Sequence, residues 1–202
     1  MENRGKNVLF IFVKNPEQGM VKTRLAADIG NDAALNVYNR LLEYTESVAT
    51  RIEVHKQIWY SKEIESDDLW PDSGYEKRIQ SGKDLGERMS NAFSENEKSG
   101  FKKQVIIGSD CAELTAGHIN KAFSKLDEYD VVLGPSEDGG YYLLGMRSYK
   151  PELFEGMSWS TENLYLETKE TIRSLKLSFA ELEMLNDIDT LDDLNKSALK
   201  WK

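Results

Sequence analysis

The chain has 202 residues, a length that suits a single domain, and 40% of them are hydrophobic, which is enough for a core and excludes a disordered chain. Its formal net charge of -9 argues against nucleic acid or an anionic membrane as the main partner, because both require clustered Lys and Arg side chains. A phosphorylated ligand is compatible with this charge, since a few local basic residues can bind one.

Cysteine and hydropathy patterns indicate the compartment. Cys111 is the one cysteine in the sequence, so no internal disulfide can form, and a reducing, cytoplasmic setting is expected. The apolar run at 8–13 is too short for the core of a signal peptide. No segment has the roughly 20 apolar residues needed to cross a bilayer, so we expect no transmembrane segment.

Apolar runs and helical stripes alternate along the chain. An unbroken apolar run at 8–13 predicts a strand buried on both faces, and the stripe from Ala34 to Val48 predicts a helix. The further elements are a weak strand (54–60), a loop (61–78), a helix from about Leu85, a strand (104–108), a helix from an N-cap at Thr115, two strands (130–134 and 141–146), a helix (161–175), a strand (177–185) and a last helix opening at Thr190.

This alternation predicts the fold class. Strands that alternate with helices favour an α/β three-layer sandwich with a mostly parallel central sheet, formed by residues 1–202 as one domain. The strands at 130–134 and 141–146 are too close for a crossover helix between them. In such sheets, ligands bind beyond the carboxyl ends of the strands, so the loops there are the candidates for chemistry.

The loop after the first strand, "KNPEQGMVKTRLA" at 14–26, collects positive charge. Lys14, Lys22 and Arg24 surround Gly19, which allows close approach of the backbone to a ligand. The spacing is neither that of a Walker loop nor that of a dinucleotide fingerprint. A solvated basic loop is the alternative, but three cations at a strand end in an acidic protein favour phosphate binding.

Acidic residues follow three other strands. Asp110 comes directly after "VIIG", where its carboxylate could hold Mg²⁺ or Mn²⁺, although it could also form a turn or cap a helix. Asp187 and Asp189 alternate, so they face opposite ways if extended, and one could be a second metal ligand. Helix capping is the alternative for this pair. No histidine is placed by the sequence to activate Cys111 as a nucleophile.

The stretch "SEDGGYYLLG" sets acids and glycines before a buried strand. Gly139 and Gly140 could simply form a tight turn. If the strands at 104–108 and 130–134 are neighbours, Asp138 lies at the same rim as Asp110. The stretch would then line a ligand site.

Six motifs in this order resemble the nucleotide-diphospho-sugar transferase superfamily with the GT-A fold. They are most similar to the bacterial family known as rSAM/selenodomain-associated transferases, described as glycosyltransferase-like. The matching segments are "KNPEQGMVKTRL" (14–25), "QSGKDLGERM" (80–89), "GSDC" (108–111), "GPSEDGGYYLLG" (134–145), "WST" (159–161) and "DIDTLDDL" (187–194). Ala112 and Leu191 stand where the family pattern has proline.

The resemblance implies roles for these residues. It implies nucleotide or phosphate binding by Lys14, Gly19, Lys22, Arg24, Gln80 and Arg88, and a metal held by Asp110, Asp189 and Asp187. It implies catalytic roles for Asp110 and Asp138, the latter as a base or as a ligand of a sugar hydroxyl. The acceptor or sugar would contact Gly139, Gly140, Tyr141, Trp159, Ser160 and Thr161.

The expected function is therefore transfer from a nucleotide-activated donor with Mg²⁺ or Mn²⁺. Glycosyl transfer from a nucleoside diphosphate sugar is preferred. The alternatives are nucleotidyl transfer, which releases pyrophosphate, and a nucleotide-binding subunit without catalysis. The sequence leaves open the nucleotide, the sugar, the acceptor, the stereochemical course and the oligomeric state.

Overall fold

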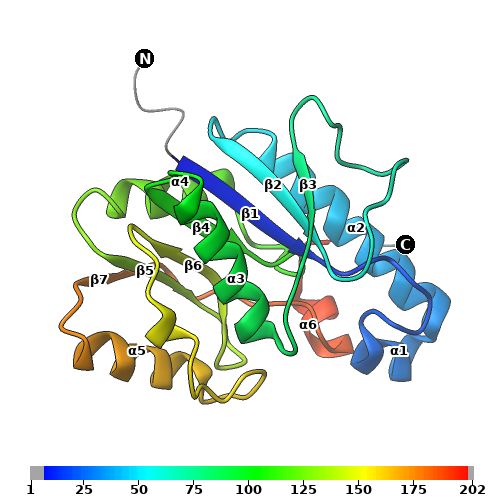
Figure 1. Cartoon of the computed structure of the whole chain (residues 1–202). Helices are drawn as coiled ribbons and strands as arrows, with labels where there is room; N and C mark the ends of the chain where they lie inside the picture. Colours follow the sequence, from blue (N-terminus) through cyan, green and yellow to red (C-terminus); the bar gives the residue numbers. More distant parts are fainter. Residues whose placement is uncertain (1–6, 200–202) are drawn as a thin grey trace.

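In the computed structural model, which describes residues 7–199, seven strands form one sheet with helices on both faces (Figure 1). The elements are β1 (Asn7–Val13), α1 (Thr23–Ile29), α2 (Asn31–Ala49), β2 (His55–Tyr60), β3 (Glu76–Ile79), α3 (Leu85–Lys98), β4 (Lys103–Ile107), α4 (Ala116–Lys125), β5 (Val131–Pro135), β6 (Tyr141–Met146), the 3₁₀ helix η2 (Pro151–Leu153), α5 (Leu164–Ser174), β7 (Phe179–Glu181) and α6 (Leu191–Lys196).

The strand order is β3-β2-β1-β4-β6-β5-β7, and β6 is the strand that runs antiparallel to its neighbours β4 and β5. The predicted mostly parallel sheet is confirmed, as is the pairing of β5 with β6 without an intervening helix. The condition considered for Asp138 and Asp110, that β4 and β5 are direct neighbours, is not met, because β6 inserts between them. Both still run in the same direction, so their carboxyl ends lie at the same edge of the sheet.

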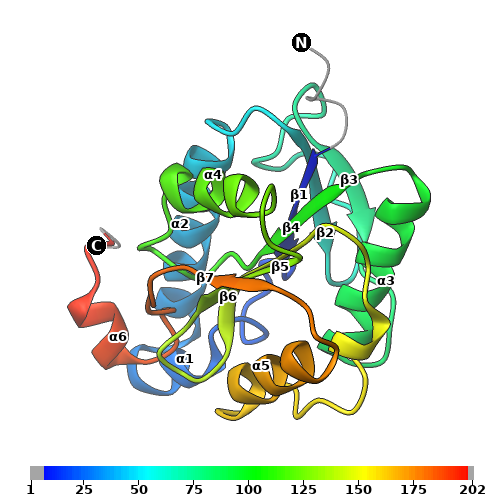
Figure 2. The same ribbon diagram turned by 90° about the vertical axis from the view of Figure 1, so that its left-hand side faces the viewer.

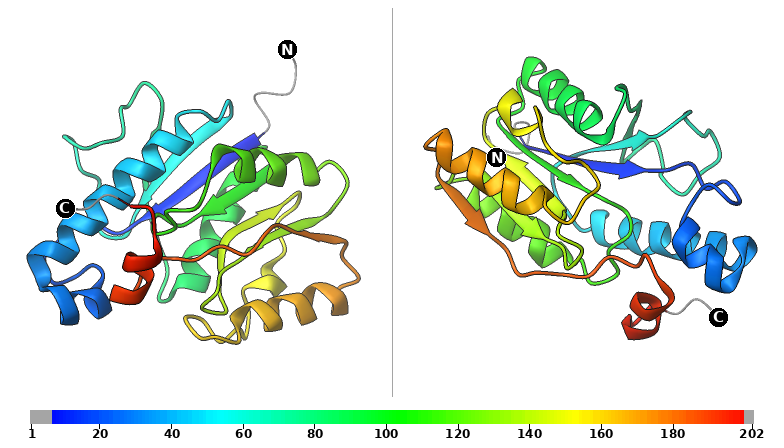
Figure 3. Two further views of the ribbon diagram at one scale, coloured as in Figure 1. Left: turned by 180° about the vertical axis from the view of Figure 1, so that it is seen from behind. Right: turned by 90° about the horizontal axis from the view of Figure 1, so that it is seen from below.

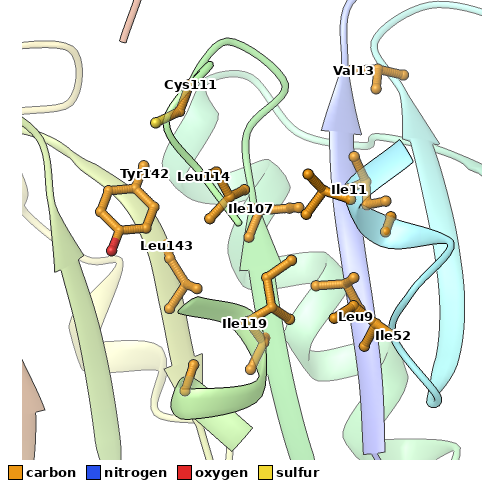
Figure 4. Close-up of a cluster of buried hydrophobic side chains, with 14 of the residues drawn as sticks. Leu9, Ile11, Val13, Ile52, Ile107, Cys111, Leu114, Ile119, Tyr142 and Leu143 are labelled. Atoms are coloured by element: carbon orange, nitrogen blue, oxygen red, sulfur yellow. The ribbon is translucent and has the colours of Figure 1, made fainter. Parts of the chain in front are cut away.

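Helices cover both faces of the sheet (Figure 2), and each face has its own apolar core. On the face of α2 and α4, Leu9 and Ile11 of β1 pack with Ile107 of β4 and Ile119 of α4 (Figure 4). On the face of α3 and α5, alternate residues of the same strands pack against a second set that includes Phe93 and Ile172. This is why the strands read as unbroken apolar runs: successive side chains point to opposite faces, and both faces are buried.

A third apolar cluster packs the last segment of the chain against its first two helices. Leu25 of α1, with Ala34 and Leu41 of α2, packs against Ile188 and Leu194 near the carboxyl end. Figure 3 shows the segment after β7 running toward α1 and α2 and ending in α6. The last loop is thereby placed beside the first one.

Three elements differ from the sequence-based predictions. β3 overlaps the end of the region predicted as a loop. Three of its four residues, EKRI, are charged, and it pairs only with β2 at the sheet edge, so it lacks the apolar pattern of a buried strand. The seven-residue helix α1 was not predicted, and β7 is shorter than the strand expected over 177–185. The predicted helix starts are confirmed, since Thr115 and Thr190 both form capping boxes.

No helix within residues 7–199 is both long enough and apolar enough to cross a membrane. The loops that follow β1, β4, β5 and β7 all leave the same edge of the sheet, because these strands run in one direction. The loops that carry Lys22, Asp110, Asp138 and the Asp187–Asp189 pair therefore lie at this edge.

Candidate functional site

An ion-paired lysine lies at the centre of this edge. The ammonium of Lys22 contacts Asp110 Oδ2 at 3.2 Å and Asp189 Oδ1 at 2.9 Å. The Lys22 side chain is only 4% exposed, whereas each carboxylate is 42% exposed. Three loops that are far apart in sequence thus meet at the Lys22 ammonium. The ammonium is buried, whereas the two aspartate side chains beside it are accessible to water.

These charges shift one another's ionisation. Burial alone would lower the pKa of Lys22, but the charges of Asp110 and Asp189 and their hydrogen bonds raise it above its ordinary value. Burial works against ionisation of Asp110, but the Lys22 ammonium, helped by Lys14, holds the pKa of Asp110 below its usual range. At neutral pH the lysine is therefore a cation between anions.

The loop backbone explains how Lys22 reaches this position. Lys22 adopts a left-handed conformation with φ of 46° and directly precedes α1, so its side chain is directed into the protein while Arg24 points outward. Arg24 is 72% exposed, and its Nη1 lies 3.6 Å from Asp189 Oδ2. Gly19 has a φ of 75°, which a residue with a Cβ rarely adopts. Lys14 is exposed at the start of the loop.

Asp187 has different hydrogen-bond partners from Asp189. Its Oδ2 accepts a hydrogen bond from Ser136 Oγ at 3.0 Å, and its Oδ1 is buried without a hydrogen-bond partner. Burial and the neighbouring charge of Asp110 raise the pKa of Asp187 to about 8. Between the two acids, the backbone N–H of Ile188 donates to the Asp110 carbonyl at 3.0 Å. The last segment is thus joined directly to the loop after β4.

Tyr38 is a site-supporting residue that the sequence analysis missed. Its buried hydroxyl accepts a hydrogen bond from the Lys14 N–H at 2.8 Å, donates to the Lys14 carbonyl at 3.0 Å, and lies 3.3 Å from Ser109 Oγ. Burial raises its pKa to about 12, so it stays neutral. A tyrosine on the buried stripe of a helix needs a polar partner for its hydroxyl, and that signal was present in the sequence.

The donor set suits a hard divalent cation. Asp110 and Asp189 offer carboxylate oxygens, the Asp187 carboxyl has an unpartnered buried oxygen, and the place between the first two already favours a positive charge. Within residues 7–199, no three His, Cys, Asp or Glu side chains are arranged as they are around a metal ion. Mg²⁺ commonly takes one or two carboxylates and completes its shell with water and substrate phosphate, so two aspartates are a sufficient anchor.

Asp138 and its glycines form a tight turn at the same edge. The exposed Asp138 accepts the Gly140 N–H at Oδ1 (2.9 Å), and the Gly139 N–H donates to the Ser136 carbonyl (3.1 Å). Gly139 has a φ of 86°, and a Cβ there would overlap the backbone of Glu162. The observed reason for this glycine is therefore contact with the 157–163 loop. Its predicted role toward an acceptor is a separate matter and stays a prediction.

The "WST" segment packs against the start of α3. A Cβ at Gly86 would overlap the Trp159 indole, and that ring stacks on Phe154 with centroids 6.3 Å apart. Ser160 has a left-handed φ of 62°, and Thr161 Oγ1 donates to the Ser158 carbonyl. Tyr141 is partly buried against the core on the α3 and α5 face. Within residues 7–199, no hydrogen bond or ion pair joins these residues to Lys22 or to its two carboxylates.

Gln80 and Arg88 make structural contacts. Gln80 Nε2 donates to the carbonyls of Val13 (3.2 Å) and Trp59 (2.8 Å), joining the ends of β1 and β2. Arg88 Nε donates to the Gly82 carbonyl at 3.2 Å. Nucleotide binding by these two residues remains a prediction. Cys111 is buried, and its pKa is raised mainly by burial, as expected for an inert thiol.

Comparisons with known proteins identify the family and the fold. Residues 44–161 match the family model described as "Uncharacterized protein conserved in bacteria (DUF2064)". A search of curated proteins found no match. A crystal structure of a candidate nucleotide-diphospho-sugar transferase from Desulfovibrio desulfuricans G20 is 34% identical, with 95% of this chain and 85% of that chain covered and a TM-score of 0.88.

More distant solved structures share the fold. The inositol-1-phosphate CTP transferase from T. maritima is 16% identical, with 97% of this chain and 94% of that chain covered and a TM-score of 0.60. The 4-diphosphocytidyl-2C-methyl-D-erythritol synthase from Anaerococcus prevotii DSM 20548 is 10% identical, with 95% and 93% covered and a TM-score of 0.58. These two structures share the α/β sandwich, and the relative with 34% identity confirms that it is of the nucleotide-diphospho-sugar transferase type.

Proposed function

Because the chain belongs to the DUF2064 family and has the fold of the nucleotide-diphospho-sugar transferases, we propose that it is a divalent-metal-dependent transferase that uses a nucleotide-activated donor. The observation that carries this proposal is the meeting of Lys22 and Arg24 with Asp110 and Asp189 at the carboxyl edge of the sheet. Cations beside paired carboxylates are what a phosphate–metal complex requires.

The roles follow from charge and exposure. Lys22 and Arg24 bind the phosphates of the donor, and Lys14 adds positive charge at the mouth of the loop. Asp110 and Asp189 would hold Mg²⁺ or Mn²⁺, which when bound offsets negative charge on the departing phosphate group. Asp187 would be an additional ligand or a neighbour of the metal's water.

The acceptor side is assigned to the turn around Asp138. Its carboxylate is exposed, and one oxygen binds the Gly140 N–H, which leaves the other free to accept a proton or a sugar hydroxyl. Gly139 and Gly140 belong to this turn. The loop that carries Trp159–Thr161 lies against it, since the Glu162 backbone abuts Gly139 and the Tyr165 N–H donates to the Gly139 carbonyl at 2.9 Å. We propose that they border the space for the acceptor or sugar.

Glycosyl transfer from a nucleoside diphosphate sugar is the preferred reaction, because the relative with 34% identity is a candidate nucleotide-diphospho-sugar transferase. Nucleotidyl transfer is the second candidate, favoured by the names of the two distant relatives, which denote CTP and diphosphocytidyl chemistry. The two reactions differ in product: the first releases a nucleoside diphosphate and the second releases pyrophosphate.

A thermal-shift screen of sugar nucleotides and nucleoside triphosphates, with and without Mn²⁺, tests the proposal first. A ligand that binds only the folded protein raises its melting temperature. The hit is then incubated with candidate acceptors, and nucleoside diphosphate and pyrophosphate are measured. A ligand that binds but yields neither product would support a non-catalytic nucleotide-binding subunit, and the absence of any nucleotide hit would contradict the proposal.

Asp110→Asn tests the metal role. The variant should lose turnover and the Mn²⁺ dependence of nucleotide binding, because a neutral amide is a poor ligand for a hard cation. Asp127→Asn is the matched control, since Asp127 pairs with Lys103 at the start of β4, at the opposite edge of the sheet. Metal dependence that persists in Asp110→Asn would exclude Asp110 as a ligand.

A further inference from the structure

The Lys22 ammonium binds one carboxylate oxygen of each of the two candidate metal ligands, Asp110 and Asp189. It contacts one oxygen of Asp110 and one of Asp189, at 3.2 and 2.9 Å. A divalent cation held by both carboxylates would need oxygens of the same two side chains. The lysine side chain and a bridging metal therefore compete for one place.

Charge makes this competition strong. A metal that entered alone would leave a buried ammonium beside a dication, and an unpaired buried charge is costly. Phosphate oxygens change this balance, because they can accept the lysine's hydrogen bonds and bring negative charge that matches the metal. The lysine then has a new partner, and the carboxylates are free.

We propose that Lys22 is a built-in placeholder that keeps divalent metal off Asp110 and Asp189 until phosphate arrives. The site binds the free metal weakly and the metal–phosphate combination well. This inference rests on the proposed function for the identity of the phosphate ligand, but the competition between lysine and metal is a property of the protein by itself. By linkage, the metal must strengthen phosphate binding as much as phosphate strengthens metal binding.

The free protein provides the direct test. Mn²⁺ binding is measured by electron paramagnetic resonance without any nucleotide, in the wild type and in Lys22→Met. The variant should bind Mn²⁺ at least about fivefold more tightly, the lower end of typical coupling between sites. Because Asp110 and Asp189 are each 42% exposed, water can solvate them when the lysine is absent, and the variant should fold.

Three further variants keep the test decisive. Lys22→Gln leaves an amide donor between the carboxylates and should also gain Mn²⁺ affinity, so it substitutes if Lys22→Met is unstable. Lys62→Met is the matched control. Lys62 pairs on the surface with Glu17, which lies on the same loop as Lys22, and it has no ion pair with Asp110 or Asp189. Its Mn²⁺ affinity should equal that of the wild type. Adding Asp189→Asn to Lys22→Met should abolish the gain.

The outcomes separate this inference from the proposed function. If both Lys22 variants bind Mn²⁺ no more tightly than the wild type, the metal binds the exposed parts of Asp110 and Asp189 without displacing the lysine. The placeholder role would then be wrong. Calorimetry of the wild type with nucleotides in the presence of a chelator tests nucleotide binding separately. Absence of nucleotide binding with a gain of Mn²⁺ affinity in the variants would refute the proposed function and retain the placeholder.

Discussion

Single side chains near the ion pairs of Lys22 with Asp110 and Asp189 show what stabilises the site. Tyr38 has hydrogen-bond partners in two loops, whereas Asp187 has one oxygen bonded and one buried without a partner. The hydrogen bonds of Tyr38 stabilise the loops, and the buried, unpartnered oxygen of Asp187 disfavours ionisation of that carboxyl group. Both effects can be measured by replacing one functional group.

Tyr38→Phe should weaken nucleotide binding without altering the reacting groups. The hydroxyl contacts the Lys14 backbone and Ser109, so its removal frees the loop after β1 and costs about 0.5–1.5 kcal/mol for each lost hydrogen bond. Tyr44→Phe is the control: it lies on the same helix and donates to the Leu114 carbonyl at 2.9 Å. Isothermal calorimetry should show a loss of affinity in the first variant only. Equal affinities in both would show that Tyr38 serves stability alone.

The raised pKa of Asp187 should make the free energy of unfolding depend on pH. Its folded-state pKa of about 8 exceeds the ordinary aspartate value, so above pH 4 the unfolded chain releases a proton that the folded protein keeps. Its contribution to stability is therefore present at low pH and is lost as the pH rises through about 8. Asp187→Asn cannot lose this proton.

In the presence of a chelator, the free energy of unfolding of Asp187→Asn should therefore rise relative to the wild type between pH 5 and pH 8. We expect a gain on the order of 1 kcal/mol or more, measured by urea denaturation. Asp127→Asn serves as the exposed control. A difference between Asp187→Asn and the wild type that does not change with pH would show that Asp187 ionises normally.

At the scale of elements, glycines at two positions allow one loop to pack closely. The loop at 157–163 packs its Trp159 ring on Gly86 of α3 and its backbone on Gly139 of the turn before β6. A methyl group has no room at either place. The acceptor side of the edge is thus built by close contact between two loops and a helix start.

Gly86→Ala should displace Trp159 and with it the whole loop. Overpacking of this kind typically costs about 1–3 kcal/mol. Gly117→Ala in α4 is the control with the opposite expected sign, since the added methyl meets nothing closer than 3.4 Å and alanine favours a helix. Thermal unfolding and the environment of the indole, followed by tryptophan fluorescence, check the result. A Gly86→Ala protein as stable as the wild type would contradict the close packing.

At the scale of the whole molecule, the site depends on the end of the chain returning to its beginning. Ile188 and Leu194 pack against α1 and α2, and the position of Asp189 depends on this contact. Residues separated by 167 positions, Lys22 and Asp189, are thereby paired. The carboxyl-terminal segment is thus part of the functional site and not only a cover for the core.

Ile188→Ala should weaken both the fold and the metal site. Ile188 is 1% exposed and lies between the two acids, so a cavity there costs about 2–5 kcal/mol and loosens Asp189. Leu194→Ala removes a side chain of the same cluster, at 2% exposure, but away from the acids. Both variants should unfold at lower denaturant concentration, and only Ile188→Ala should also lose Mn²⁺–nucleotide affinity. Equal affinities would mean that the cluster does not position Asp189.

The sequence by itself determined the fold class and the loops that carry charge. Runs such as 8–13 and 104–108 must be buried on both faces, and strands that alternate with helices form a mostly parallel sheet. Because the carboxyl ends of parallel strands share an edge, the loops with Lys22 and Asp110 could be expected to meet. Short polar elements such as β3 and α1 lacked an apolar pattern and were missed.

Only the tertiary structure decided the partners. The place of β6 between β4 and β5, the pairing of Lys22 with two aspartates at once, and the different partners of Asp187 and Asp189 depend on contacts between residues far apart in sequence. The same holds for Gly86 and Gly139, whose close contacts come from the 157–163 loop. Local patterns report burial and chain direction, but such pairings follow from how the three clusters pack, which is a property of the whole chain.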